Sequence, residues 1–102
     1  MVRISKEEAR PVTAGEEVHS AVRRNKLVFF IIPPGEKLAR RVIVPHNTLV
    51  EDGTGIGRFI EVLDPKTNKP HFGIFEQRGG RRGVWWFEHE DHTFTVLKLP
   101  EE

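Results

Sequence analysis

The run Arg78-Gly79-Gly80-Arg81-Arg82-Gly83 places three guanidinium groups within five residues, a pattern suited to binding phosphate. Aromatic residues lie close by at Phe75 and Trp86, and Phe59 lies further upstream. Aromatic rings stack on the bases of single-stranded nucleic acid while cations contact its phosphates. These residue types predict a surface for RNA or single-stranded DNA.

Further basic residues could extend this surface. Positions 23–41 hold six basic residues and one acidic residue, although the net charge of the chain is only +1. We expect Arg40 and Arg41 to contribute to binding, with Arg23 and Arg24 beside them, because clustered charges of one sign create a local field. The 78–83 run also resembles in composition the arginine–glycine segments that bind RNA, but two adjacent glycines equally suit a tight turn.

Metal binding and catalysis are weaker alternatives. His89 and His92 are predicted to face each other across a turn, with His71 on a neighbouring strand, but an acid-rich turn is more often solvated than metal-bound. We therefore predict no metal and no other cofactor. The chain has no cysteine or tyrosine, and only Glu61 near His71 offers an acid–base pair, so the sequence points away from an enzyme.

The N-terminal part has the pattern of a short helix. Thr13 and Glu16 match a capping box, and Val18, Ala21 and Val22 then share one helical face. The pattern predicts a helix over 14–24. Residues 1–12 are expected to be poorly ordered.

The rest of the chain has the pattern of β-strands. A continuous apolar run predicts a strand at 27–32 that is covered on both faces. A second strand is expected at 38–44, and Asp52-Gly53 marks a hairpin. Apolar alternation predicts four more strands, at 58–64, 71–77, 82–89 and 92–99.

Loop lengths predict how the last four strands pair. A two-residue turn at Gly79-Gly80 sets Ile74 opposite Trp85, and a two-residue turn at Glu90-Asp91 sets Phe87 opposite Phe94. A five-residue loop at 65–69 sets Ile60 opposite Ile74. These registers form an antiparallel meander with one apolar face, made of Ile60, Val62, Phe72, Ile74, Trp85, Phe87, Phe94 and Val96.

The other face of this meander is mixed. It would carry Trp86 over Gly73, together with Phe59, Phe75 and Arg82. If the N-terminal helix covers this face, the three aromatic residues belong to the core, and otherwise they form a binding platform. The sequence leaves both arrangements open.

The expected fold is α+β and mainly antiparallel β, with a short N-terminal helix followed by a β-meander that forms a two-layer sheet or a small barrel. The 102 residues fit a single domain, 1–102, and lack any apolar run long enough to span a bilayer. The chain has no cysteine and one methionine, and 30% of its residues are charged. From this composition we expect a cytoplasmic protein, and the same composition is compatible with a thermophilic source. A domain this small gains from association, so a protein-interaction module or a homo-oligomeric subunit without catalytic activity is the alternative to nucleic-acid binding.

Overall fold

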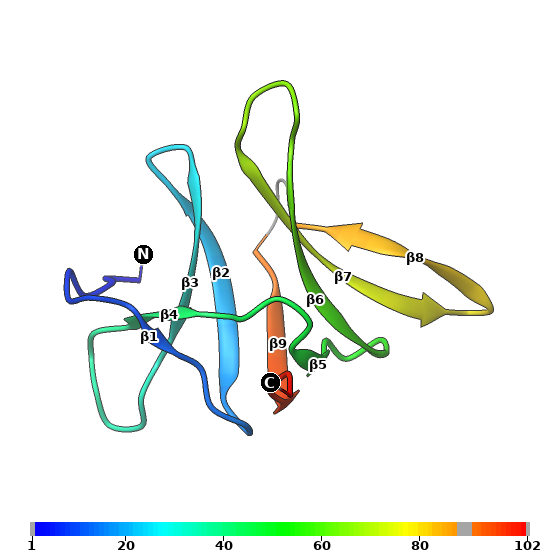
Figure 1. The fold of residues 1–102 in the computed structure, drawn as a ribbon. Coiled ribbons are helices and arrows are strands. Elements are labelled where there is room, and N and C mark those ends of the chain that lie inside the picture. The colour runs from blue at the N-terminus through cyan, green and yellow to red at the C-terminus, as the bar shows by residue number, and fades with distance from the viewer. Residues whose placement is uncertain (1, 88–90, 102) are drawn as a thin grey trace.

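The computed structural model describes residues 2–87 and 91–101, which form nine β-strands in one sheet and no helix. The strand order is β1-β4-β3-β2-β9-β5-β6-β7-β8, and the sheet is mostly antiparallel and not closed. Figure 1 shows β1–β4 on one side and β6–β8 on the other, with β5 and β9 between them. No described helix could cross a membrane. The strands are β1 (Arg10–Pro11), β2 (Glu17–Arg23), β3 (Lys26–Ile31), β4 (Arg40–Ile43), β5 (Leu49–Glu51), β6 (Ile56–Leu63), β7 (Pro70–Arg78), β8 (Arg81–Trp86) and β9 (Thr93–Lys98).

The helix predicted over 14–24 is wrong, because most of this segment forms β2. Part of the capping-box pattern is present: the amide of Thr13 donates a hydrogen bond to the Glu16 carboxylate (2.7 Å). Gly15, however, has a φ of 91°, which ends any helical path there. The local hydrogen bond therefore closes a turn rather than starting a helix.

The end of β2 explains why a strand is preferred over a helix. Arg24 and Asn25 both adopt positive φ values, 51° and 63°, and this two-residue turn sends the chain back along β3. Asn25, which the sequence pattern treats as a helix stop, is thus a hairpin residue. Strand β2 pairs with β3 along one edge and with β9 along the other, and these long-range pairings override the weak local preference for helix.

The early strand predictions are confirmed. Strand β3 coincides with the predicted strand at 27–32 to within one residue at each end, β4 lies within 38–44, and the Asp52-Gly53 hairpin joins β5 to β6. Strand β3 is covered on both faces, since Phe29 packs in the main core while Phe30 packs in a second, smaller cluster. This double coverage accounts for its continuous apolar sequence.

The predicted β7–β8 register is also confirmed. Ile74 lies opposite Trp85, and Gly73 lies opposite Trp86. Both residues of the Gly79-Gly80 turn have positive φ, 53° and 82°, a conformation that glycine adopts without steric cost. The two tryptophans therefore point to opposite faces of the sheet, as predicted.

The predicted β6–β7 register is wrong by one residue. Phe59, rather than Ile60, lies opposite Ile74. The loop holds four residues instead of five, because the amide of Asp64 donates to the Lys69 carbonyl (2.9 Å) and Asn68 turns the chain with a φ of 59°. A slip of one residue exchanges the two faces of a strand, so Phe59 enters the core and Ile60 leaves it.

The predicted pairing of β8 with β9 is wrong. Strand β9 lies between β2 and β5, and β8 is the last strand in the order. Residues 88–90 lie outside the described residues. They include Glu90 of the predicted Glu90-Asp91 turn and the last two positions of the predicted 82–89 strand. Phe87 and Phe94 still meet, with ring centroids 5.9 Å apart, but they do so through side-chain packing across the core.

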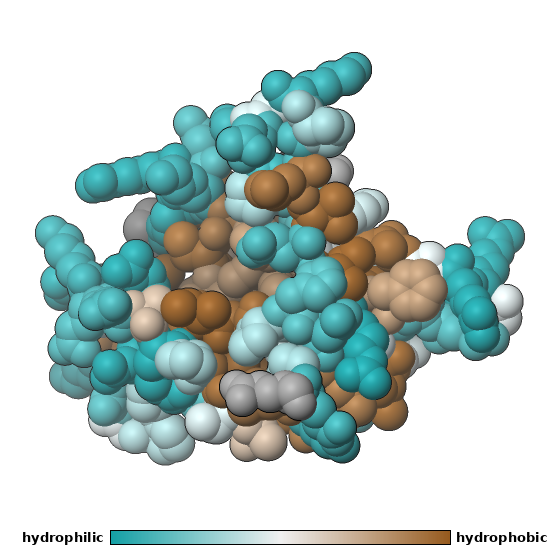
Figure 2. Space-filling model, viewed as in Figure 1, coloured by the Kyte–Doolittle hydropathy of each residue, from teal (hydrophilic) through white to brown (hydrophobic). Residues whose placement is uncertain are grey.

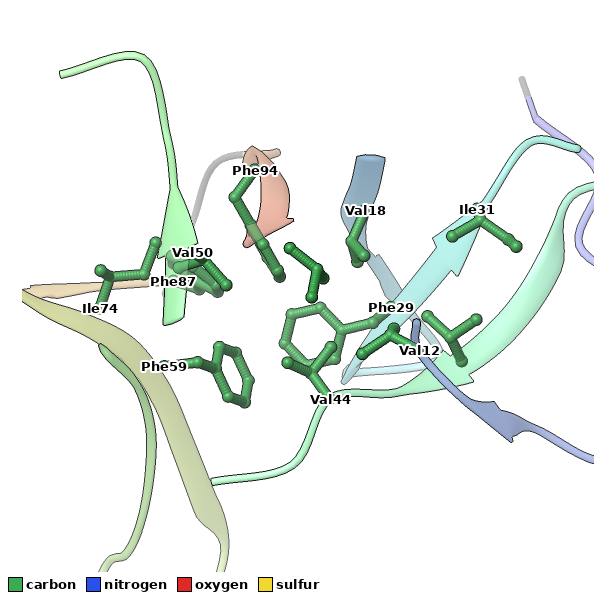
Figure 3. Packing of buried hydrophobic residues seen from close by; sticks show 12 residues of the cluster. Val12, Val18, Phe29, Ile31, Val44, Val50, Phe59, Ile74, Phe87 and Phe94 are labelled. Carbon is green, nitrogen blue, oxygen red and sulfur yellow. The ribbon is translucent and has the colours of Figure 1, made fainter. Parts of the chain in front are cut away.

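The core lies between the two sides of the molecule, as Figure 3 shows. Phe29 projects from β3 and meets Phe59 of β6 edge to face, with a centroid separation of 5.3 Å and an interplanar angle of 82°. Such contacts are favourable arrangements for buried aromatic rings. The core joins distant parts of the chain through its buried residues Val12, Val18, Phe29, Ile31, Val42, Val44, Val50, Phe59, Ile74, Phe87, Phe94 and Val96.

Candidate nucleic-acid interface

The β6–β7–β8 sheet presents one face to the core and one face away from it. We call the second the outer face. Side chains alternate along each strand, and the observed registers assign them to the two sides. In Figure 2, hydrophobic residues gather over this part of the molecule, beside the hydrophilic tip of the β7–β8 hairpin. The outer face consists of Ile56, Arg58, Ile60, Val62, His71, Gly73, Phe75, Gln77, Arg82, Val84 and Trp86.

Two aromatic side chains are open on the outer face. Phe75 is 45% exposed and Trp86 is 38% exposed. Phe75 is paired with Val84 and Trp86 is two residues further along β8, so the two rings are diagonal neighbours on adjacent strands. No helix covers them within the part of the chain that the structure describes. Phe75 and Trp86 thus occupy an open platform rather than a core.

Phe59 does not belong to this platform. It is only 1% exposed and packs against Phe29 and Phe94 in the core. The shorter 65–68 loop is the reason, because it rotates Phe59 inward relative to the expected register. Phe59 therefore cannot stack on a bound base.

The three arginines of the hairpin tip are divided between the two faces. Arg82 pairs with Gln77 on the outer face, whereas Arg78 and Arg81 pair with each other on the inner side of the sheet. Arg78 is held by ion pairs to Asp52 and Glu76, and its guanidinium lies 4.2 Å from the centre of the Trp85 ring. Of the three, Arg82 is the one aligned with Phe75 and Trp86.

Arg58 is the residue that the sequence analysis missed. It lies on the outer face, opposite Phe75 across the β6–β7 pair, and it is exposed. One guanidinium nitrogen donates to the Asn47 carbonyl (3.2 Å). The clue in the sequence is Asn68, which readily adopts the left-handed conformation that closes a four-residue loop and so brings Arg58 to this face.

Arg40 and Arg41 lie elsewhere. They are on β4, separated from β6–β8 in the strand order by β3, β2, β9 and β5. Arg40 forms an ion pair with the Glu7 carboxylate (3.4 Å), and Arg41 donates to the Glu7 carbonyl (2.9 Å). These two residues do not extend the outer face.

The cluster of Asp52, Glu76 and Arg78 joins the end of β7 to the β5–β6 turn. Glu76 is 3% exposed, and burial raises the pKa of its carboxyl despite the hydrogen bond and charge of Arg78. Burial also acts to raise the pKa of Asp52, but hydrogen bonds from Thr54 and the charge of Arg78 outweigh it, so that pKa is lowered. Arg78 thus connects the β5–β6 turn to β7 as a structural residue.

The histidines do not form a metal site among the described residues. His71 contacts the Asp64 carboxylate (3.4 Å) and lies near Trp86, with ring centroids 6.2 Å apart. His92 instead stacks on Phe87, with centroids 4.3 Å apart. His89 lies outside the described residues, and no group of three metal-ligating side chains occurs within them.

Comparison of the chain with protein-family models, with curated proteins and with solved structures gives no match. Its function must therefore be inferred from the chemistry of its own surfaces. The outer face combines two open rings with Arg58 and Arg82, and none of its residues is a carboxylate.

Proposed function

We propose that the outer face binds single-stranded RNA or DNA. The observation that carries this proposal is the placement of Phe75 and Trp86, both open, on the same face as Arg58 and Arg82. Stacking on an aromatic side chain contributes about 1–3 kcal/mol per base and tolerates any sequence. The two rings bind bases, and the two arginines pair with phosphates on either side of them.

The charge of the outer face favours a polyanion. Arg58 and Arg82 lie on its strands, while carboxylates stand only at its margins: Glu51 on β5 lies opposite Ile56, and Asp64 follows β6 and contacts His71. Glu61 and Glu76 belong to the opposite side of the same strands. A phosphate backbone that crosses Phe75 therefore meets two cations, and strands β6–β8 place no carboxylate on the face that it crosses.

The experiment is a titration of fluorescent single-stranded RNA and DNA at two salt concentrations. Phosphate contacts make the affinity fall as salt rises. We expect Phe75→Leu and Trp86→Leu each to weaken binding roughly tenfold, from loss of a stacking platform worth about 1–3 kcal/mol. The absence of binding at low salt would refute the proposal.

The neighbouring arginines supply a matched pair of variants. Arg82→Gln removes a cation from the outer face, and Arg81→Gln removes one from the other side of the same strand. We expect Arg82→Gln to weaken binding and to lower the slope of affinity against salt, and Arg81→Gln to do neither. Equal effects of the two substitutions would show that only general charge near the tip matters.

A protein partner is the second candidate for the same face. Ile56 and Val62 are exposed on the same face as Phe75, and β8 has no partner along its outer edge among the described residues. Exposed apolar surface and a free strand edge are features of association sites. Light scattering distinguishes the two: a dimer that dissociates in Phe75→Leu and shows no affinity for oligonucleotides supports association.

A further inference from the structure

A basic cavity lies on the opposite side of the molecule from the outer-face strands. Its volume is about 500 Å³, and it is bounded by the N-terminal segment, the end of β2 with its turn, and β4. Four cationic side chains line it, and none of its lining residues is acidic. Ser5 adds a hydroxyl, and Ile4 and Val28 provide an apolar wall. The cations are Lys6, Arg23, Arg24 and Arg41.

The fold brings these residues together from distant parts of the sequence. The amide of Ser5 donates to the Ala39 carbonyl (2.7 Å), which holds the N-terminal segment beside the approach to β4. Arg23 donates to the Val2 carbonyl (3.4 Å), and Arg41 donates to the Glu7 carbonyl (2.9 Å). In Figure 1 the segment that precedes β1 lies beside the β2–β3 hairpin, in agreement with the contact between Val2 and Arg23. The cavity is therefore built by tertiary contacts.

The protein itself compensates the cations of the cavity incompletely. The Nε of Arg41 is buried and has no hydrogen-bond partner among the described residues. Four like charges around one cavity also repel one another. A bound oxyanion would neutralise the cations and could accept hydrogen bonds from the guanidinium groups.

We infer that this cavity binds the phosphoryl group of a small phosphorylated molecule. Guanidinium groups pair with phosphate oxygens in a planar, two-point geometry, and lysine contributes a point charge. Arg23, Arg24 and Arg41 supply the first type of contact and Lys6 the second. The site is separate from the proposed nucleic-acid interface, because β9 and β5 lie between the two in the strand order.

Tripolyphosphate is the probe, and calorimetric titration at low ionic strength gives its affinity. The test variant is Lys6→Gln/Arg24→Asn, since asparagine suits the left-handed turn and so removes a charge without harming the hairpin. We expect its affinity for tripolyphosphate to fall at least tenfold. Arg58→Gln/Arg82→Gln, which removes two charges from the outer face, should bind tripolyphosphate as the parent protein does.

The inference would be overturned if tripolyphosphate failed to bind the parent protein, or if Arg58→Gln/Arg82→Gln lost as much affinity as the test variant. A competition experiment separates a small ligand from a nucleic-acid backbone. Saturating tripolyphosphate should leave the affinity for the fluorescent oligonucleotide unchanged after correction for ionic strength. If the oligonucleotide instead displaces tripolyphosphate, the cavity belongs to a nucleic-acid path and the inference of a separate site is wrong. Failure of oligonucleotide binding alone refutes only the proposed function of the outer face.

Discussion

Trp86 lies directly over Gly73, and the space above this glycine is filled by its neighbours. A Cβ atom at position 73 would come within 3.0 Å of Cε3 of Trp86 and within 2.8 Å of Cγ1 of Val84. Gly73 pairs with Trp86 across β7 and β8, so the missing side chain is what allows the indole to rest against the sheet. The open platform of the outer face thus depends on a glycine.

Gly73→Ala should therefore destabilise the protein and displace the indole. Inserting a methyl group into a filled space costs about 1–3 kcal/mol. Urea denaturation measures the change in the free energy of unfolding, and acrylamide quenching in a Trp85→Phe background reports the position of Trp86. Gly83→Ala is the control, because its Cβ would lie 4.0 Å from the nearest atoms and should change stability by less than about 0.5 kcal/mol. Equal costs at both positions would contradict the packing of Trp86 on Gly73.

The β6–β7 register predicts a large difference between Phe59 and Phe75. Replacing a buried phenylalanine by alanine costs about 3–5 kcal/mol, whereas a surface change typically costs far less. Phe59→Ala should therefore lower the free energy of unfolding by several times more than Phe75→Ala, since Phe59 is buried and Phe75 is open. Denaturant titration of both variants measures this. A greater loss for Phe75→Ala would restore the register that the five-residue loop predicts.

Arg78 should matter for stability far more than its neighbour Arg81. Arg78→Met leaves the Asp52 and Glu76 carboxylates together without their cation, and loss of one partner from a buried ion pair costs about 3–5 kcal/mol. We expect a loss somewhat below this range because Arg78 is partly exposed, and a change near zero for Arg81→Met.

The pH dependence of the same variant gives a second check. Without Arg78, Glu76 loses the hydrogen bond and the charge that oppose the effect of burial, so its raised pKa should rise further. The folded state then binds a proton more tightly than the unfolded state, which stabilises it as pH falls. The deficit of Arg78→Met should therefore shrink between pH 7 and pH 5 in urea denaturation. A deficit that grows toward pH 5 would contradict this electrostatic account.

The ion pair of Arg10 and Glu16 should stabilise the N-terminal turn in a pH-dependent way. The hydrogen bond from Arg10 lowers the pKa of Glu16 from 4.5 to about 2. A carboxyl with a depressed pKa in the folded state stabilises the protein above pH 4.5, and this contribution is lost as pH falls toward 2. Glu16→Gln should cost about 1 kcal/mol at pH 7, the scale of a partly exposed pair, and nothing near pH 2.

Urea denaturation from pH 2 to pH 7 follows this difference. Glu17→Gln is the matched control, because Glu17 is the next residue and its side chain, which contacts His19 (3.4 Å), is largely exposed. A constant difference between Glu16→Gln and the parent protein at every pH would show that Glu16 acts through packing alone.

Several features of the sheet, above all the β7–β8 hairpin, are determined by the local sequence. Alternation of apolar side chains and the Gly79-Gly80 turn determine that Trp85 and Trp86 face opposite ways, and both turn glycines adopt the expected positive φ. The Asp52-Gly53 hairpin and the apolar strand β3 are encoded in the same manner. These features depend on neighbouring residues, for which side-chain periodicity and turn chemistry are sufficient.

Features that depend on contacts between distant residues could not be predicted from the sequence pattern and were decided by the tertiary structure. Segment 14–24 has a helical pattern, yet it becomes β2 because β3 and β9 supply its backbone with partners. Strand β9 likewise pairs with β2 and β5 rather than β8, and one residue of loop length decides whether Phe59 or Ile60 enters the core. Short-range patterns limit which conformations are open to each segment. Only the burial of one shared core selects which strands meet and in which register, since that free energy is gained by the chain as a whole.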